Sequence, residues 1–239
     1  MRNIYLILCL ACGALLSLCG CARTVTSLQL AGNDLVFTVN VSSEIQNGNR
    51  YYVIISGSST DIAVPALGDY FVAPGEGDFD ESKLKEFGPD PTTINAYYRE
   101  YFDTWSDVIL FDITDKSSNS GASTYLIKSG LASFPDTVTQ NTIYSPTIPN
   151  NIEAPYMPGT TQLRCHIPLS QFSVAYAQGA RIYFKILTVS DSRILSDLTD
   201  GSVYVENTAA ADNRGSEAGD AYAGSHGSFD ITSWIARVE

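Results

Sequence analysis

Apolar and polar residues alternate along much of the chain. Residues 35–42 give the clearest case, because Leu35, Phe37, Val39 and Val41 are separated by polar residues over most of the segment. A period of two is typical of a β-strand that buries one face. The pattern therefore predicts a half-buried strand here.

Other segments have the length and composition of strands: 24–30, 50–56, 107–113, 124–128, 161–167, 181–189, 202–206 and 229–236. Residues 24–30 and 35–42 are expected to form a hairpin around the turn at 31–34. Residues 50–56 are apolar on both faces, which is typical of an inner strand.

Residues 161–167 predict a strand with two different faces. The alternation places Leu163, Cys165 and Ile167 inward. It places Gln162, Arg164 and His166 outward, and Pro168 is expected to end the strand.

One segment has helical spacing. Aromatic and aliphatic residues recur every three or four positions at Ile94, Tyr97, Tyr98, Tyr101, Phe102 and Trp105. Asp90-Pro91 is a helix start signal. We expect a helix over about 91–104, with the aromatic stripe packed on a sheet.

Three long loops are expected, at 74–90, 131–160 and 207–228. Many short strands with turn-rich connections favour an antiparallel β-sandwich, immunoglobulin-like or jelly-roll-like, with one short helix. No repeat or linker divides the chain, so residues 24–239 are expected to form a single domain.

The first residues have the character of an export signal. Arg2 precedes an apolar run at 4–18, which would be about 23 Å long as a helix, too short for an apolar layer of about 30 Å. A secretory signal over 1–20 fits better. No later run approaches 18 apolar residues, so no transmembrane helix is expected.

Leu18-Cys19-Gly20-Cys21 resembles the lipobox of bacterial lipoprotein precursors. Cys19 departs from that pattern, in which Ala, Ser, Thr or Val is commoner. The resemblance implies cleavage after residue 20, acylation of Cys21, and a lipidated anchor at 21–23 in the membrane. Ala22, in place of Asp, implies the outer membrane, on its periplasmic leaflet or at the cell surface, rather than the inner membrane.

Charge excludes one class of partner. The 239 residues carry a formal net charge of −12, which repels phosphate backbones, so no nucleic-acid role is expected. Cleavage of the signal would remove Arg2, taking Lys plus Arg from 14 to 13 against 26 acids, a net charge of −13. An anionic body on a lipid tether is expected to stand off anionic headgroups.

Catalytic groupings are sparse. Cys165 is the one cysteine outside the leader and lipobox, so no internal disulfide is expected. Its neighbour His166 would point to the opposite face of a strand, which favours Cys165 as a core residue. His226 is the other histidine, and no G-x-S-x-G motif accompanies it. A nucleophilic triad or a zinc site is therefore not expected.

Acidic loops leave calcium open as a structural ion. Asp78, Asp80 and Glu81 could supply carboxylate ligands, and Asp197 and Asp200 with Ser202 form another candidate. The alternative is that these acids are simply solvated, with no cofactor. With 26 acids, the sequence neither proposes nor excludes a pair of catalytic carboxylates.

Aromatic residues make up 11% of the chain, and Tyr suits both sugar stacking and protein interfaces. Tyr144 and Tyr156, in the proline-rich segment 131–160, are the candidates for exposed ligand contacts.

Leu-Arg-Cys-His-Ile-Pro-Leu-Ser at 163–170, followed by 181–189 and Asp191, resembles the closing part of carbohydrate-binding sandwich modules of the DOMON and family-9-like kind. The likeness covers about 30 of 239 residues. It implies a sandwich that binds sugar or haem, although no histidine or methionine here corresponds to a haem ligand.

Together these features predict a lipid-anchored, non-enzymatic binding module of the cell envelope, whose ligand is a carbohydrate or another envelope protein. Two alternatives stay open. One is an envelope glycoside hydrolase that uses paired carboxylates, and the other is a structural subunit of an envelope assembly.

Overall fold

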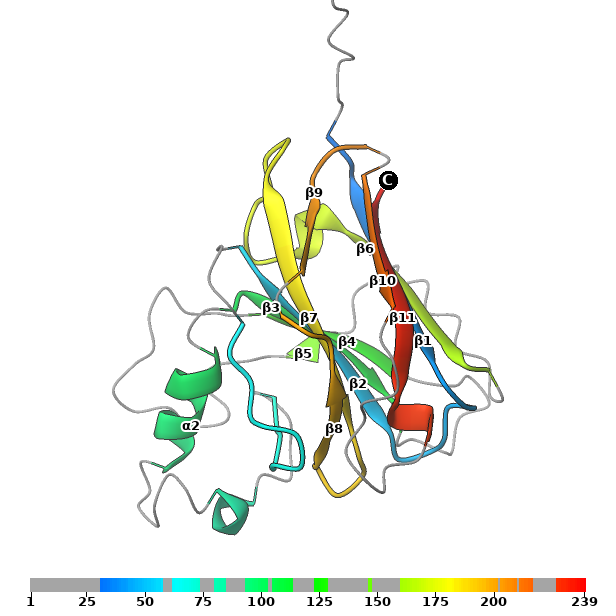
Figure 1. Ribbon diagram of the computed structural model, residues 1–239. Coiled ribbons are helices and arrows are strands. Elements are labelled where there is room, and N and C mark those ends of the chain that lie inside the picture. Colours follow the sequence, from blue (N-terminus) through cyan, green and yellow to red (C-terminus); the bar gives the residue numbers. More distant parts are fainter. Residues whose placement is uncertain are drawn as a thin grey trace, which may run out of the picture.

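The computed structural model describes residues 31–57, 62–73, 80–84, 93–102, 105–113, 123–128, 146–147, 160–201, 203–209, 211–216 and 227–239. Two antiparallel sheets pack face to face as a β-sandwich, and a short helix lies beyond one of them (Figure 1). The predicted fold class is therefore confirmed.

The smaller sheet has four strands, in the order β10 (Asp212–Ser216), β11 (Ile231–Val238), β1 (Asp34–Val41) and β6 (Gln162–Pro168). The larger sheet runs β5 (Pro146–Thr147), β4 (Ser123–Lys128), β3 (Asp107–Asp112), β2 (Arg50–Ser56), β7 (Arg181–Val189) and β8 (Leu195–Leu198), and β9 (Val203–Glu206) also pairs with β7. Short 3-10 turns complete the described elements: η1 (Glu81–Lys83), η3 (Leu169–Gln171) and η4 (Gly227–Phe229).

The main core lies between the two sheets. Leu35, Phe37 and Val39 of β1 are almost fully buried, as the alternation predicts. The Phe37 ring meets that of Phe184 edge to face at 5.0 Å, and Phe184 meets Trp234 at 5.4 Å. Such edge-to-face pairs add to the burial of apolar area. The facing strands are thus joined by an aromatic row.

Strand β6 has the two faces expected from its sequence. Leu163, Cys165 and Ile167 are buried, whereas Gln162 and Arg164 are exposed. Cys165 is a core residue, since its side chain packs within the cluster between the sheets.

The helix α2 (Thr93–Phe102) forms a third layer (Figure 1). Tyr97, Tyr98 and Phe102 are buried with Trp105 in a second core on the outer face of the larger sheet. The Phe102 ring lies 5.4 Å from that of Tyr98 and 5.1 Å from that of Trp105. The aromatic stripe therefore packs on a sheet, as expected. Residues 91–92 and 103–104, at the two ends of the predicted helix, lie outside the described residues.

Strands β8 and β10 were not expected from the sequence. Residues 207–228 were predicted as a loop, yet β10 lies within them and pairs with β11. Its sequence, DNRGS, has no apolar alternation. Likewise β5 falls in the segment 131–160 that was predicted as a loop. The predicted strand at 24–30 lies outside the described residues, and β1 pairs with β11 on one edge and β6 on the other.

Polar contacts fix the turn before β11 to the larger sheet. Asn49 donates through Nδ2 to the Tyr51 hydroxyl at 2.9 Å and to Oγ of Ser228 at 2.8 Å. The Thr188 hydroxyl donates to the Phe229 carbonyl at 2.7 Å. These buried and partly buried bonds hold the turn that leads into β11. Within the described part of the chain, no helix is long and apolar enough to cross a membrane.

Candidate ligand-binding site

Several residues singled out in the sequence lie outside the described part of the structure: Cys21, Asp78, Tyr144 and Tyr156. Their predicted roles stay predictions. Glu81 begins η1, next to Asp80.

Asp80 is exposed, and its Oδ1 accepts hydrogen bonds from the backbone N–H of Ser82 at 3.1 Å and from the Ser82 hydroxyl at 2.6 Å. The hydroxyl bond lowers the pKa of the Asp80 carboxyl. Over the described ranges, no group of three or more His, Cys, Asp or Glu residues is arranged to hold a metal ion.

Asp197, from the second calcium candidate, makes hydrogen bonds within the sandwich. Its carboxylate is fully buried and accepts the backbone N–H of Ile231 at 2.6 Å and of Leu198 at 2.8 Å. These bonds tie β8 to the first residue of β11, so the carboxylate is engaged in holding the two sheets together.

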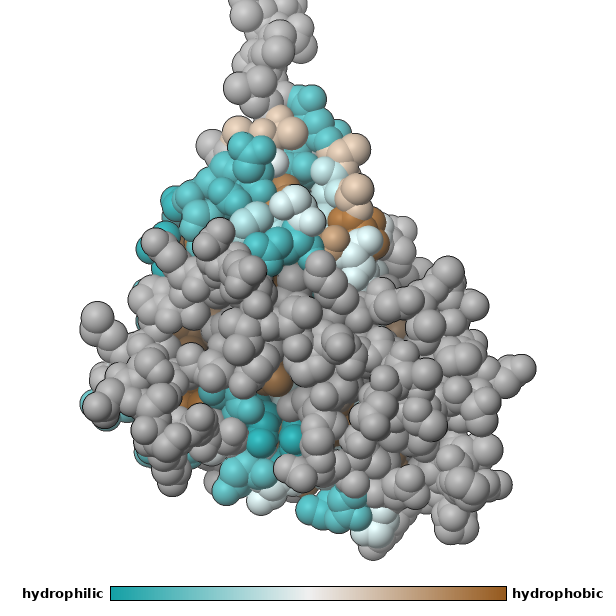
Figure 2. All heavy atoms as spheres, turned by 180° about the vertical axis from the view of Figure 1, so that it is seen from behind, coloured by the Kyte–Doolittle hydropathy of each residue, from teal (hydrophilic) through white to brown (hydrophobic). Residues whose placement is uncertain are grey.

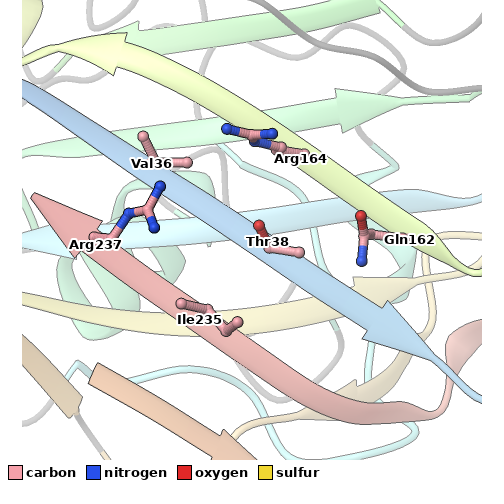
Figure 3. Close-up of a pocket in the computed structure, with 6 residues that line it drawn as sticks. All are labelled: Val36, Thr38, Gln162, Arg164, Ile235 and Arg237. Carbon is pink, nitrogen blue, oxygen red and sulfur yellow. The ribbon is translucent and has the colours of Figure 1, made fainter. Parts of the chain in front are cut away.

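A hollow lies on the outer face of the four-stranded sheet (Figure 3). It encloses about 290 Å³ and is lined by six residues from three adjacent strands: Val36, Thr38, Gln162, Arg164, Ile235 and Arg237. The period of two explains this lining, because alternate residues of each strand project to the same face. Its volume is near the lower end of the range for small-molecule pockets.

The strand register arranges these side chains. Thr38 lies between Arg164 of β6 and Ile235 of β11, whereas Val36 pairs with Arg237 of β11. The two arginines therefore lie on opposite sides of β1 and are offset by two residues along it. Two strand spacings across the sheet and a two-residue step along it place their Cα atoms about 12 Å apart. In Figure 3 both guanidinium groups extend toward the side chain of Val36.

The floor of the hollow is apolar. Val36 is only 4% exposed although it projects outward, and Ile235 is half-buried. Arginine stems commonly cover apolar neighbours while the charged head stays in water. The hollow thus combines an apolar base with a cationic rim.

The two arginines differ in their counter-charges. Arg237 pairs through Nη2 with Oε1 of Glu239. Arg164 is exposed, and it has no ion-pair partner within the described part of the chain. Arg164 is therefore a cation without a counter-charge in a chain of net charge −12.

Neighbouring charges on the same face are paired. Arg214 pairs with Asp212 on β10, and Nε2 of His166 lies 3.2 Å from Oδ2 of Asp34. The Asp34, Asp212 and Glu239 carboxylates therefore each lie against a nitrogen-bearing side chain of the four-stranded sheet.

Polar groups of the lining offer hydrogen bonds. Gln162 donates through Nε2 to Oδ1 of Asn40 at 2.9 Å, which holds the amide in place and leaves its oxygen as an acceptor. The Thr38 hydroxyl makes no hydrogen bond to the described residues, so it can donate to or accept from a ligand.

The alternation in 161–167 predicts outward positions for Gln162 and Arg164 but indicates no role for them. Arg237 and Ile235 join them only through the pairing of β1 with β11. The available signal was the outward position of Arg164 in a chain that has 26 acids against 14 Lys and Arg residues.

The surface beyond the hollow is mostly polar where it is described. At the end of the sandwich where β1 begins and β11 ends, hydrophilic side chains predominate around a small apolar area (Figure 2).

No family model matches this chain, and comparison with curated proteins and with solved structures likewise found no match.

Proposed function

We propose that this chain is an exported lipoprotein, anchored through Cys21, whose β-sandwich binds a small ligand without catalysing a reaction. The lipobox-like sequence at 18–21 supports the anchor. The hollow on the four-stranded sheet supports the binding role.

The single observation that carries the binding role is the composition of the hollow. Val36 and Ile235 give an apolar floor, Thr38 and Gln162 offer hydrogen bonds, and Arg164 and Arg237 supply charge. Four of the six lining residues are polar or charged, which suits a small polar ligand whose orientation such groups fix. The six residues lie on paired strands, which hold them more rigidly than a loop would.

The anchor and the hollow are compatible in space. Strand β1 begins at Asp34, 34 − 21 = 13 residues after Cys21, and a chain of that length spans at most about 45 Å. Such a tether permits the acidic body to stand away from the membrane with the hollow open to solutes.

A thermal-shift screen of envelope glycans and small metabolites tests the binding role. Thr38→Trp would fill the hollow from an outward position, whereas Ser216→Trp adds the same side chain to the exposed edge strand β10. Ligands are expected to raise the Tm of the wild type and of Ser216→Trp but not of Thr38→Trp. Equal shifts in all three proteins, or none in any, would contradict binding in the hollow.

Detergent phase separation tests the anchor. The wild type is expected in the detergent phase, because two or more acyl chains hold a protein in a membrane stably. Cys21→Ala should move to the aqueous phase, with Cys19→Ala as the matched control that stays anchored. A Cys21→Ala protein that still enters the detergent phase would refute the anchor.

The hydrolase and structural-subunit hypotheses stay untested predictions.

A further inference from the structure

We infer that the hollow binds a small acidic sugar by its carboxylate, which Arg164 and Arg237 hold from opposite sides of β1. This inference rests on the proposed binding function and names the chemical class of the ligand. It follows from the charges, the register and the lining of the hollow.

The first step concerns charge. Guanidinium groups bind carboxylates with two parallel hydrogen bonds, which gives both strength and geometric specificity. Arg164 has no ion-pair partner in the described structure, and its guanidinium extends toward Val36, as does that of Arg237 (Figure 3). A carboxylate seated above Val36 would therefore meet donors from two strands.

The second step concerns Glu239, the ion-pair partner of Arg237. Its carboxylate already binds Arg237, so that arginine is placed to receive a carboxylate. Arg237 and Glu239 are about half exposed, with side-chain exposures of 46% and 39%, and exposed pairs of this kind contribute little free energy. A ligand carboxylate that also reaches Arg164 can compete with Glu239.

The third step limits the charge of the ligand. Asp34 lies two residues before Val36 on the same face, and Asp212 pairs in register with Arg237. Both carboxylates would repel a second negative charge. A singly charged carboxylate is therefore favoured over a doubly charged phosphate.

The remaining lining suits a sugar ring. Thr38 and Gln162 can hydrogen-bond ring hydroxyls, while Val36 and Ile235 can contact the apolar face of the ring. A hollow of about 290 Å³ matches a ligand of monosaccharide size more closely than a drug-sized molecule. A hexuronic acid combines a single carboxylate, ring hydroxyls and an apolar ring face in one small molecule.

Isothermal titration of the full chain with D-glucuronate, D-glucose and inorganic phosphate tests this inference. Glucuronate is expected to bind at least about tenfold more tightly than glucose, the change that one charge-assisted hydrogen bond produces. Phosphate should bind more weakly than glucuronate.

Variants locate the carboxylate. Arg164→Ala is expected to weaken glucuronate binding about tenfold or more, and Arg164→Lys should weaken it less because the charge remains. Glu239→Gln should strengthen binding because it frees Arg237. Arg181→Ala removes an exposed arginine from β7, in the other sheet, and is the matched control that should leave binding unchanged. Circular dichroism checks that each variant is folded.

Three outcomes would overturn the inference: glucuronate and glucose binding equally, no binding of glucuronate, or phosphate binding more tightly than glucuronate. None of these outcomes decides the proposed binding function, which the thermal-shift screen with Thr38→Trp tests separately. A folded Arg164→Ala variant that binds glucuronate with wild-type affinity would also overturn it.

Discussion

At the scale of single residues, Gly215 shows how a polar edge strand packs on the core. A Cβ atom at this position would lie 2.3 Å from Cζ2 of Trp234 and 2.6 Å from its Cε2. An indole ring buried against Phe184 cannot move aside without disturbing its neighbours. Only glycine therefore fits at the position of β10 that pairs with Trp234.

Gly215→Ala is expected to lower the free energy of unfolding by about 1–3 kcal/mol, because it overpacks the ring. Ser216→Ala, at the next and exposed position, should change it by less than about 0.5 kcal/mol. Urea unfolding measures both variants. Equal stabilities for the two would show that Trp234 has room to shift.

Cys165 offers a second test at this scale. Burial raises the pKa of its thiol from 9.0 to about 12. The unfolded thiol therefore ionises first, so the stability that the neutral buried thiol contributes is complete below pH 9 and falls as pH rises toward 12. Burial also raises the pKa of Tyr176, from 10.0 to about 12, but this contribution is shared by the wild type and Cys165→Ala and cancels in the difference between them.

In urea unfolding, the wild type is expected to be more stable than Cys165→Ala at pH 7 because the variant leaves a cavity. That difference should shrink between pH 9 and pH 10. A difference that stays constant over this interval would mean that the thiol is accessible to water in the folded protein.

The inward or outward orientation of the side chains in β1 and β6 could be predicted from the sequence. The alternation in β1 and β6 gave the correct inward and outward residues, because the burial of one face dominates the free energy of a strand. The neighbours of Arg164 in the hollow could not be predicted, since most of them belong to other strands.

At the scale of elements, the buried Asp197 carboxylate links the two sheets. It accepts the backbone N–H of Ile231, at the start of β11, from its place in β8. Asp197→Ala would leave that donor without its acceptor in a buried position, at a cost of about 2–3 kcal/mol of unfolding free energy.

Asp191→Ala is the matched control, since Asp191 is exposed in the turn before β8. It should alter the free energy of unfolding by less than about 0.5 kcal/mol. Thermal or urea unfolding compares the two proteins. If Asp197→Ala were as stable as Asp191→Ala, the link between β8 and β11 would contribute nothing to stability.

Most of the strands were predictable, including the four-residue β9, whereas β5, β8 and β10 were not. The strand at Arg181–Val189 was predicted with its observed bounds, and the helix was placed correctly by its aromatic spacing. β8 has four residues and β10 no apolar alternation. Both strands form because tertiary partners provide the pairing, which a local pattern does not record.

At the scale of the whole molecule, the hollow depends on distant parts of the chain. Thr38 lies beside Ile235 although 235 − 38 = 197 residues separate them. No periodicity within either segment specifies that pairing. The sequence therefore predicted the sandwich but not the strand order, and without the strand order it could not predict the hollow.

The proposed role at the cell envelope depends on export of the protein and lipidation of Cys21. Mass spectrometry of the amino-terminal peptide of the protein, isolated from the cells that make it, tests this claim most directly. We predict a peptide that begins at Cys21 and carries the added mass of a diacylglyceryl group. A peptide that retains residues 1–20, or one with an unmodified Cys21, would contradict the claim.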